Sequence, residues 1–232
     1  MSAIIGIVEQ VGIFLAGIAV RLGVVAVAAL ALLVPAVLLW AAFRGAAWAR
    51  RRAQGLTEAG GLRFRPGLRY APGHTWLRLR AGAVRVGVDD LVQGLLPWAM
   101  TVRLPHPGAI LRAGEPAAVL AAGDREAVIC APVDGVVTAV NGDAIRDPSL
   151  VKSDCYARGW LFQMKAEGDG LTRLVADGAA RAWLAAEGER LHRWLEPRLG
   201  LAAADGGTLA GPVAPHLAPA DWKALQEEFL RR

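Results

Sequence analysis

Cysteine is scarce in this chain of 232 residues, which contains only Cys130 and Cys155. Two cysteines cannot build a disulfide framework, and neither stands in a spacing typical of a metal site or a redox pair. We expect both to be buried thiols. The sequence also has no phosphate-cradling glycine-rich loop and no serine, histidine and aspartate arrangement with a nucleophile turn. These absences favour a protein that is not an enzyme and that holds neither a cofactor nor a metal ion.

Lysine is almost as scarce, so arginine carries most of the positive charge. The three lysines are Lys152, in a turn or short helix, Lys165, at the end of a strand, and Lys223, in a C-terminal helix. Arginine is concentrated between residues 44 and 80, where Glu58 is the only acidic residue. The arginines of this region are Arg44, Arg50, Arg51, Arg52, Arg63, Arg65, Arg69, Arg78 and Arg80.

Charge is absent from residues 22–43, LGVVAVAALALLVPAVLLWAAF. About 20 such residues suffice to cross a membrane, so we predict a single-pass transmembrane helix over 22–43. The positive-inside rule then places the domain after Arg44 in the cytoplasm, at the cell membrane. We expect membrane lipids to be partners, through contacts with Arg44, Arg50, Arg51 and Arg52. Residues 1–21 are apolar but contain Glu9, and they either lie at the outer interface, extend the anchor or cross a second time.

A linker over residues 44–61 is expected to lead into a mainly β domain over 62–170. WLRLR (76–80) and AVRVGV (83–88) alternate apolar and other residues, as half-buried strands do. Similar short runs follow, separated by turn signals such as Gly123-Asp124 and Asn141-Gly142. Many short strands of this kind predict a β-sandwich or flattened barrel.

Helical periodicity returns after the β region. It predicts a helical segment over 171–197, with Gly178 as a break and Pro197 at its end, then a linker over 198–220 and a helix over 221–232. Trp183 and Trp194 are expected to pack on a buried face, and the alternative is that they anchor a partner. Whether these helices pack on the β domain is left open.

Three positions in the β region invite a functional interpretation. His74 is expected to be a packed, hydrogen-bonded histidine rather than a ligand. His106, between Pro105 and Pro107, is expected in an exposed loop. Asp89 and Asp90 could suggest a divalent-ion site, but the start of a helix is the preferred interpretation.

The region of residues 70–166 resembles the glycine cleavage system H protein. The resemblance is carried by YAPGHTWLRLR, VRVGVDDLVQGLL, VRLPHPGAILRAGEPAAVLAAGDREAVICAPVDGVVTAVN and DPSLVKSDCYARGWLFQMKA. It implies a lipoyl-domain-like fold in which one hairpin projects a lysine at its tip. In the family, lipoate on that lysine carries an aminomethyl group between enzymes.

The family's modified lysine stands seven residues before the alanine of Ala131-Pro132-Val133, and here that position is Asp124. A carboxylate cannot form the lipoyl amide, so lipoylation is excluded at this position. Gly123 and Asp124 still favour a tight turn, and the hairpin is expected to persist. The candidate binding residues of this tip are Gly123, Asp124, Arg125 and Glu126.

The sequence therefore predicts a membrane-anchored, non-lipoylated module resembling the H protein, which acts as a non-catalytic protein-interaction or scaffold domain. An unidentified protein partner would bind at the hairpin or at the C-terminal helices. The first alternative is a lipoyl carrier of the glycine cleavage system, with lipoate on Lys152 or Lys165. The second is a basic membrane protein that binds nucleic acid through arginines interleaved with Phe64 and Tyr70, but juxtamembrane lipid contact explains the arginines more simply.

Overall fold

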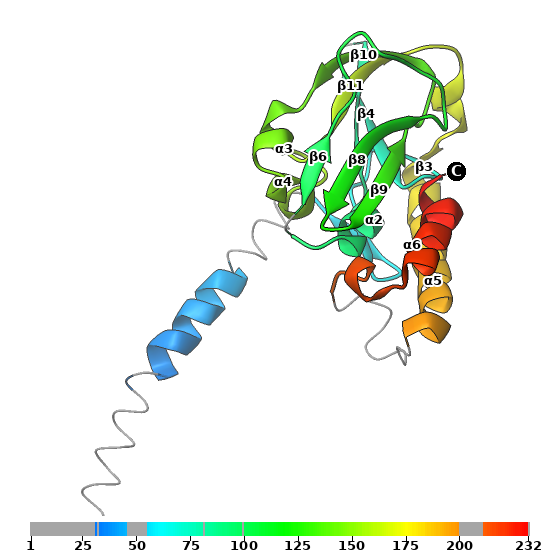
Figure 1. The fold of residues 1–232 in the computed structure, drawn as a ribbon. Coiled ribbons are helices and arrows are strands. Elements are labelled where there is room, and N and C mark those ends of the chain that lie inside the picture. Colours follow the sequence, from blue (N-terminus) through cyan, green and yellow to red (C-terminus); the bar gives the residue numbers. More distant parts are fainter. Residues whose placement is uncertain are drawn as a thin grey trace, which may run out of the picture. The chain divides into compact units, whose positions relative to one another are not determined.

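The structure, a computed structural model, describes residues 31, 33–45, 55–80, 82–98, 100–199 and 211–231. The chain divides into two compact units, Met1–Gln54 and Gly55–Arg232. The second unit contains both the β region and the C-terminal helices (Figure 1).

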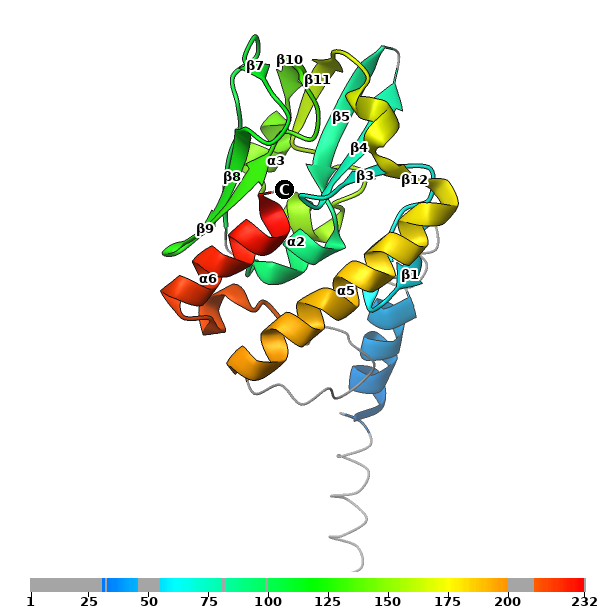
Figure 2. The same ribbon diagram turned by 90° about the vertical axis from the view of Figure 1, so that its right-hand side faces the viewer.

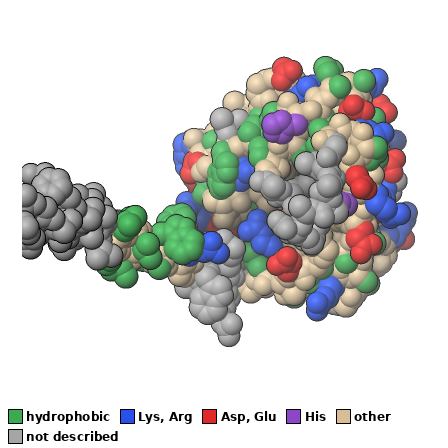
Figure 3. All heavy atoms as spheres, turned by 90° about the horizontal axis from the view of Figure 1, so that it is seen from below, with side chains coloured by type: hydrophobic (Ala, Val, Ile, Leu, Met, Phe, Trp, Pro, Cys, Tyr) green, Lys and Arg blue, Asp and Glu red, His purple; other side chains and the backbone are tan. Residues whose placement is uncertain are grey.

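The described part of the first unit is helical over residues 33–45, and all of its described side chains are exposed. Hydrophobic side chains, green in Figure 3, dominate the visible side of this helix, and the guanidinium of Arg44 lies 4.9 Å from the ring centre of Trp40. Among the residues that the structure describes, no helix is both long and apolar enough to cross a membrane. Part of the span expected over 22–43, all of residues 1–21, and Arg50, Arg51 and Arg52 lie outside the described residues. The transmembrane helix therefore stays a prediction.

The second unit is built on short antiparallel strands. These are β1 (Thr57–Ala59), β2 (Leu62–Phe64), β3 (Arg69–Ala71), β4 (Thr75–Arg80), β5 (Ala83–Val88), β6 (Thr101–Arg103), β7 (Ile110–Leu111), β8 (Pro116–Ala122), β9 (Arg125–Cys130), β10 (Gly135–Val140), β11 (Phe162–Ala166) and β12 (Val175–Ala176). One sheet has the order β12-β3-β4-β5-β11-β10-β7, a second has the order β6-β8-β9, and β1 pairs with β2.

A single buried cluster joins the two larger sheets. Alternation along strands such as β8 supplies one side chain in two to this cluster, because successive residues of a strand point to opposite faces. Leu77 and Val86 face each other across β4 and β5, while Leu120 and Ile129 come from β8 and β9, and all four are fully buried. The prediction of a mainly β, sandwich-like domain is confirmed.

Strand structure begins earlier than the expected boundary at residue 62, because β1 lies inside the segment interpreted as linker. Gly60 and Gly61 both have a positive φ, as a two-residue type I′ hairpin turn requires. A Cβ atom on Gly60 would lie 2.7 Å from the backbone of Ala185, so the turn also allows a helix to pack closely against it.

Seven helices and helical turns of more than three residues accompany the sheets in the described part of the second unit, together with one shorter turn. They are α2 (Asp90–Leu95), α3 (Gly142–Arg146), α4 (Ser149–Ser153), η1 (Gly170–Arg173), α5 (Asp177–Leu199), α6 (Pro219–Leu225) with the π-helical turn η3 (Gln226–Leu230), and the 3-10 turn η2 (Ala214–His216). Figure 2 shows α6 running beside β9, with α5 at the same end of the molecule.

The helix boundaries differ from the expected ones in three places. Gly178 does not break the helix, because it lies in the first turn, where backbone N–H groups have no partner within the helix. Pro197 does not end it either, since α5 continues through the last turn to Leu199. At the C-terminus α6 begins at Pro219, two residues before the expected start, with proline in the first turn as helices favour.

The open question about the C-terminal helices is answered by their burial. Leu184, Leu191 and Leu195 of α5 are buried, and so are Trp222 and Phe229 of the terminal segment, all within the same core cluster as the strands. Burying a side chain of this size stabilises the folded state by roughly 1.5–3 kcal/mol. The helices are therefore part of the domain core.

Candidate functional site at the hairpin of β8 and β9

The hairpin of β8 and β9 has the geometry that the sequence predicts. Ala122 pairs with Arg125, so Gly123 and Asp124 alone form the turn. Gly123 has a φ of 63°, and Asp124 has no positive φ. This pattern matches a type II′ turn, which favours glycine at its first central residue. The apex of the hairpin is therefore a tight, well-defined turn.

The four candidate tip residues do not share one environment. The Asp124 side chain is 82% exposed, and Gly123 is exposed beside it. Arg125 has only 12% of its side chain exposed, because its guanidinium donates to the carbonyl of Leu217, 2.7 Å away, and so it is not displayed at the tip as the binding interpretation requires. Glu126 is half-exposed and pairs with Arg103 of β6 at 2.6 Å. The apex thus displays one carboxylate, and the next residue belongs to the contact with the C-terminal segment.

No lysine stands on this turn. The ammonium of Lys152 donates to the carbonyls of Gln93 and Leu96, at the end of α2, and the group is half-buried, which lowers its pKa. Lys165 is exposed on β11. Lys223 is exposed on α6, with its Nζ 4.0 Å from Glu227. All three occupy the kinds of element that the sequence predicted, and none is in a hairpin turn.

The outer edge of β9 is covered by the terminal segment, residues 211–231. In the β6-β8-β9 sheet, β9 is an edge strand. The side-chain oxygen of Gln226 accepts a hydrogen bond from the backbone N–H of Val128 at 3.1 Å, and the indole of Trp222 donates to the carbonyl of Glu126 at 3.0 Å. Two side chains thus satisfy backbone groups that a neighbouring strand would otherwise pair.

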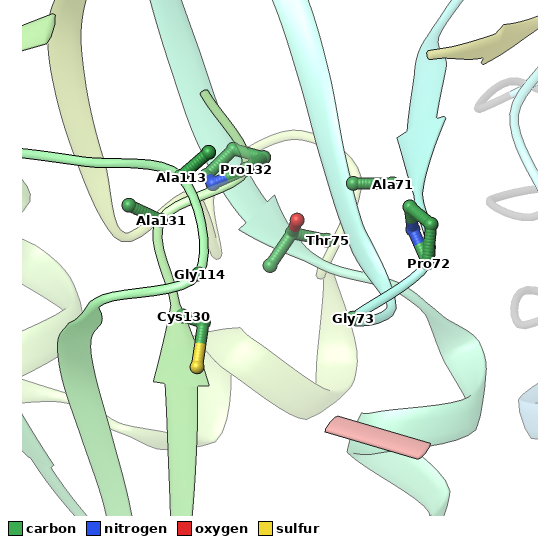
Figure 4. Close-up of a pocket in the computed structure, with 9 residues that line it drawn as sticks. All are labelled: Ala71, Pro72, Gly73, Thr75, Ala113, Gly114, Cys130, Ala131 and Pro132. Carbon is green, nitrogen blue, oxygen red and sulfur yellow. The ribbon is translucent and has the colours of Figure 1, made fainter. Parts of the chain in front are cut away.

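A cavity of about 210 Å³ lies between the turn that joins β3 to β4 and the end of β9 (Figure 4). It is lined by Ala71, Pro72, Gly73, Thr75, Ala113, Gly114, Cys130, Ala131 and Pro132. Figure 4 shows Thr75 between the two walls. Burial raises the pKa of the Cys130 thiol, so it stays protonated at neutral pH, although Arg231 opposes the shift. The lining contains no charged side chain and therefore suits a small, mainly apolar group.

His74 is packed and hydrogen-bonded, as expected, and its neighbours form a network that the sequence did not reveal. Its Nδ1 lies 2.8 Å from Asp89, and its Nε2 lies 3.4 Å from Glu187 of α5. Burial opposes the charged form, but the two carboxylates outweigh it and raise the pKa of His74 to about 9. Arg190 then links Glu187 to Glu228 of η3. The network connects the β domain to both C-terminal helices.

The remaining predictions about single residues hold. Asp89 caps α2 by accepting hydrogen bonds from the backbone of Leu91 and Val92. His106 is exposed. Trp183 is partly buried and stacks on His74 at 5.2 Å.

Trp194 is also partly buried against the core and lies edge-on to Phe229. Both cysteines are free and buried. Within the part of the chain that the structure describes, no three His, Cys, Asp or Glu side chains are grouped as a metal site would require.

Comparison with known proteins finds relatives for about half of this chain. A family model described as glycine cleavage H-protein matches residues 68–186. The glycine cleavage system H protein of Mycolicibacterium vanbaalenii is 37% identical over 120 residues, which is 51% of this chain and 88% of that protein. The glycine cleavage system H protein of Escherichia coli is 40% identical over 109 residues, 46% of this chain and 84% of that protein.

A solved structure of a glycine cleavage system H protein from Mycobacterium marinum covers 53% of this chain and 99% of its own, with 25% identity and a TM-score of 0.46. The family match ends before the terminal segment. Because the matched residues are half of the chain and include the hairpin of β8 and β9, the chain belongs to the glycine cleavage H-protein family.

Proposed function

We propose that this member of the family carries no lipoate and acts by protein contact, as a non-catalytic interaction or scaffold domain tethered to the cell membrane by residues 22–43. The observation that carries the proposal is the carboxylate of Asp124 at the exposed apex of the hairpin. A swinging arm needs a primary amine there, and a carboxylate cannot form the amide. The hairpin keeps the shape of a presenting turn without the group that would be presented.

The tether is supported by the sequence. Residues 22–43 contain no charged side chain, and Arg44 follows them directly. A run of this length covers the hydrocarbon layer, and the arginines after it favour a cytoplasmic domain. Extraction of membranes with alkaline carbonate tests this part: the full chain should stay in the pellet, and release into the supernatant contradicts the anchor.

The absence of lipoate is tested by the intact mass of the full chain after co-expression with lipoylating enzymes. We expect the unmodified mass. A gain of one lipoyl group contradicts the proposal, and peptide mapping then identifies the acceptor, since the chain has only three lysines. Lys165 and Lys223 are the exposed ones, and each has its own variant, K165Q and K223Q, to assign the modification.

The lipoyl carrier is the competing function, because the matched relatives are glycine cleavage system H proteins. It predicts exchange activity with glycine decarboxylase in a reconstituted assay. If the tip instead binds a protein, partners should be captured with the detergent-solubilised wild-type chain. These partners should be absent when D124R is used for the capture and present when D169R is used. Asp169 is a matched control, because it is also an exposed aspartate but lies outside the hairpin.

A further inference from the structure

The outward face of β4, β5 and β11 is basic. Arg85 of β5 pairs with Arg78 of the neighbouring strand β4 and with Gln163 of the other neighbouring strand, β11, so all three side chains lie on the same face of the sheet. Alternation adds Arg80 and Lys165 to the same face, because residues two apart in a strand point the same way. The opposite face carries Leu77, Val84, Val86, Phe162 and Met164, which are all buried. We call Arg78, Arg80, Arg85 and Lys165 the basic face.

Positive charge on the basic face is only partly compensated within the described chain: the guanidinium of Arg78 donates to the carbonyl of Tyr156 at 2.6 Å and is attracted by Asp154. The ion pairs found between described residues do not include Arg78, Arg80, Arg85 or Lys165. The pKa of Arg78 is lowered, first by partial burial and then by the charges of Arg65, Arg85 and Arg80, against a smaller opposite effect of Asp154. Binding of an anion reduces the electrostatic repulsion between positive charges that are held close together in this way.

The aromatic groups of this face decide which anion fits. Trp160 is partly exposed and is already stacked on Arg85, with the guanidinium 4.8 Å from the ring centre. Trp76 is fully buried, and its indole donates to the carbonyl of Cys155. Neither ring is free to stack on bases, as binding of single-stranded nucleic acid requires. A tryptophan beside an arginine is suited to the phosphate region of a bilayer. The indole ring can lie partly in an apolar and partly in a hydrated environment there. The guanidinium can donate two hydrogen bonds to the oxygens of one phosphate.

We propose that the basic face is a contact surface for anionic phospholipid headgroups, which lays the domain against the membrane. The part that rests on the proposed function is the tether: a charge-free run ending at residue 43 would keep the domain beside a bilayer and raise the local concentration of lipid. The attraction should weaken with salt, because screening limits it to about 10 Å at 0.1 M.

The small number of lysines supplies the test. Lys165 is exposed within the basic face, while Lys223 is exposed on α6 and serves as an internal control. The full chain is placed in nanodiscs of phosphatidylcholine alone or with phosphatidylglycerol, and the acetylation of each lysine is followed by mass spectrometry. We expect Lys165 to react roughly tenfold more slowly when phosphatidylglycerol is present. Lys223 should react at the same rate in both, and about 0.5 M salt should abolish the difference.

Variants distinguish the effect of the basic face on the protection of Lys165 from the effect of the net charge of the chain. R80Q/R85Q should lose the protection of Lys165, whereas R112Q/R193Q, which removes the same charge from exposed positions elsewhere, should retain it. Arg85 is partly buried against Trp160, so R80Q alone, at an exposed position, is the second variant and should lose part of the protection.

Equal reactivity of Lys165 in both kinds of nanodisc overturns the proposal. So does protection by single-stranded DNA or polyglutamate that is as strong as protection by phosphatidylglycerol, because the surface would then select polyanions in general. If the chain does not enter nanodiscs, the tether has failed, and vesicles of the same lipids replace them. The basic face must still bind the anionic vesicles more strongly, and its failure there is separate from the failure of the anchor.

Discussion

The imidazole Nδ1 of His74 lies 2.8 Å from Oδ2 of Asp89, and neither side chain is exposed. The ring is held from its other side by Glu187 and stacks on Trp183, both from α5. His74 also has a φ of 57° and is the only described residue other than glycine with a positive φ. A charged imidazole therefore links the turn before β4 to a helix more than one hundred residues later.

This link makes the stability of the domain depend on pH. The pKa of His74 is about 9 in the folded chain and 6.5 in the reference state. The stabilisation that the charged His74 gives to the folded chain is therefore fully present below about pH 6.5 and is lost as the pH rises through about 9. We expect the free energy of unfolding in urea to fall by a few kcal/mol over this interval.

H74N provides the control for this prediction, because asparagine tolerates a positive φ and can still donate to Asp89 but does not titrate. The variant should be less stable than the wild type at about pH 6 and should show a flatter pH profile. A wild-type profile that rises between neutral pH and about pH 9 contradicts the charged state of His74.

Gly87 lies under the ring of Trp76, and we expect G87A to destabilise the fold. A Cβ atom at this position would lie 2.5 Å from Cζ2 of Trp76, a fully buried ring that cannot move away freely. Forcing extra volume into a packed core typically costs about 1–3 kcal/mol. G142A is the matched control, because a Cβ atom there meets nothing within 4 Å. Urea denaturation compares the two, and equal stabilities would mean that Trp76 relaxes without cost.

Much of the sheet could be predicted because its strands alternate visibly. The predicted runs at 76–80 and 83–88 correspond to β4 and β5, and Gly123-Asp124 forms the predicted turn. The hairpin of β1 and β2 was missed because its strands have three residues each, too few for a period to show. Its Gly60-Gly61 turn lay in a segment whose arginines suggested a linker.

The environment of the hairpin could not be predicted in the same way. The contact of Gln226 with Val128 joins residues 98 apart through a side chain, and no local pattern in the sequence marks it. The sequence makes Arg125 a candidate binding residue of the tip, yet its guanidinium reaches the carbonyl of Leu217. Charged side chains next to a turn can point along the strand, and long-range packing decides which way they go.

The terminal segment should protect β9 from self-association. Q226A leaves the N–H of Val128 without its partner, and W222A also removes a buried ring. We expect losses of about 1–3 kcal/mol for Q226A and about 3–5 kcal/mol for W222A. Both variants should also self-associate more than the wild type in analytical ultracentrifugation, because an exposed edge strand pairs with another chain.

K223A is the control for the terminal segment, since Lys223 is exposed on the same helix and its distance to Glu227 is 4.0 Å. It should change neither stability nor self-association measurably. If W222A is as stable and as monomeric as K223A, the segment does not cover the edge in solution.

Restoring an amine at the apex tests whether the hairpin has kept its presenting shape. Asp124 is 82% exposed, and the turn depends on the positive φ of Gly123 rather than on the carboxylate, so D124K should fold normally. On co-expression with lipoylating enzymes we expect D124K to gain the mass of one lipoyl group, while the wild type gains none.

D169K, with its amine on an exposed loop, should gain none either. A folded D124K that stays unmodified would mean that the turn is no longer accessible to such enzymes. The terminal segment beside β9 is the first feature to suspect in that case, because Trp222 and Gln226 contact the strand within four residues of the apex. D124K/W222A would then separate the two causes: modification of the double variant alone would assign the block to the covered edge, and its absence would assign it to the turn itself.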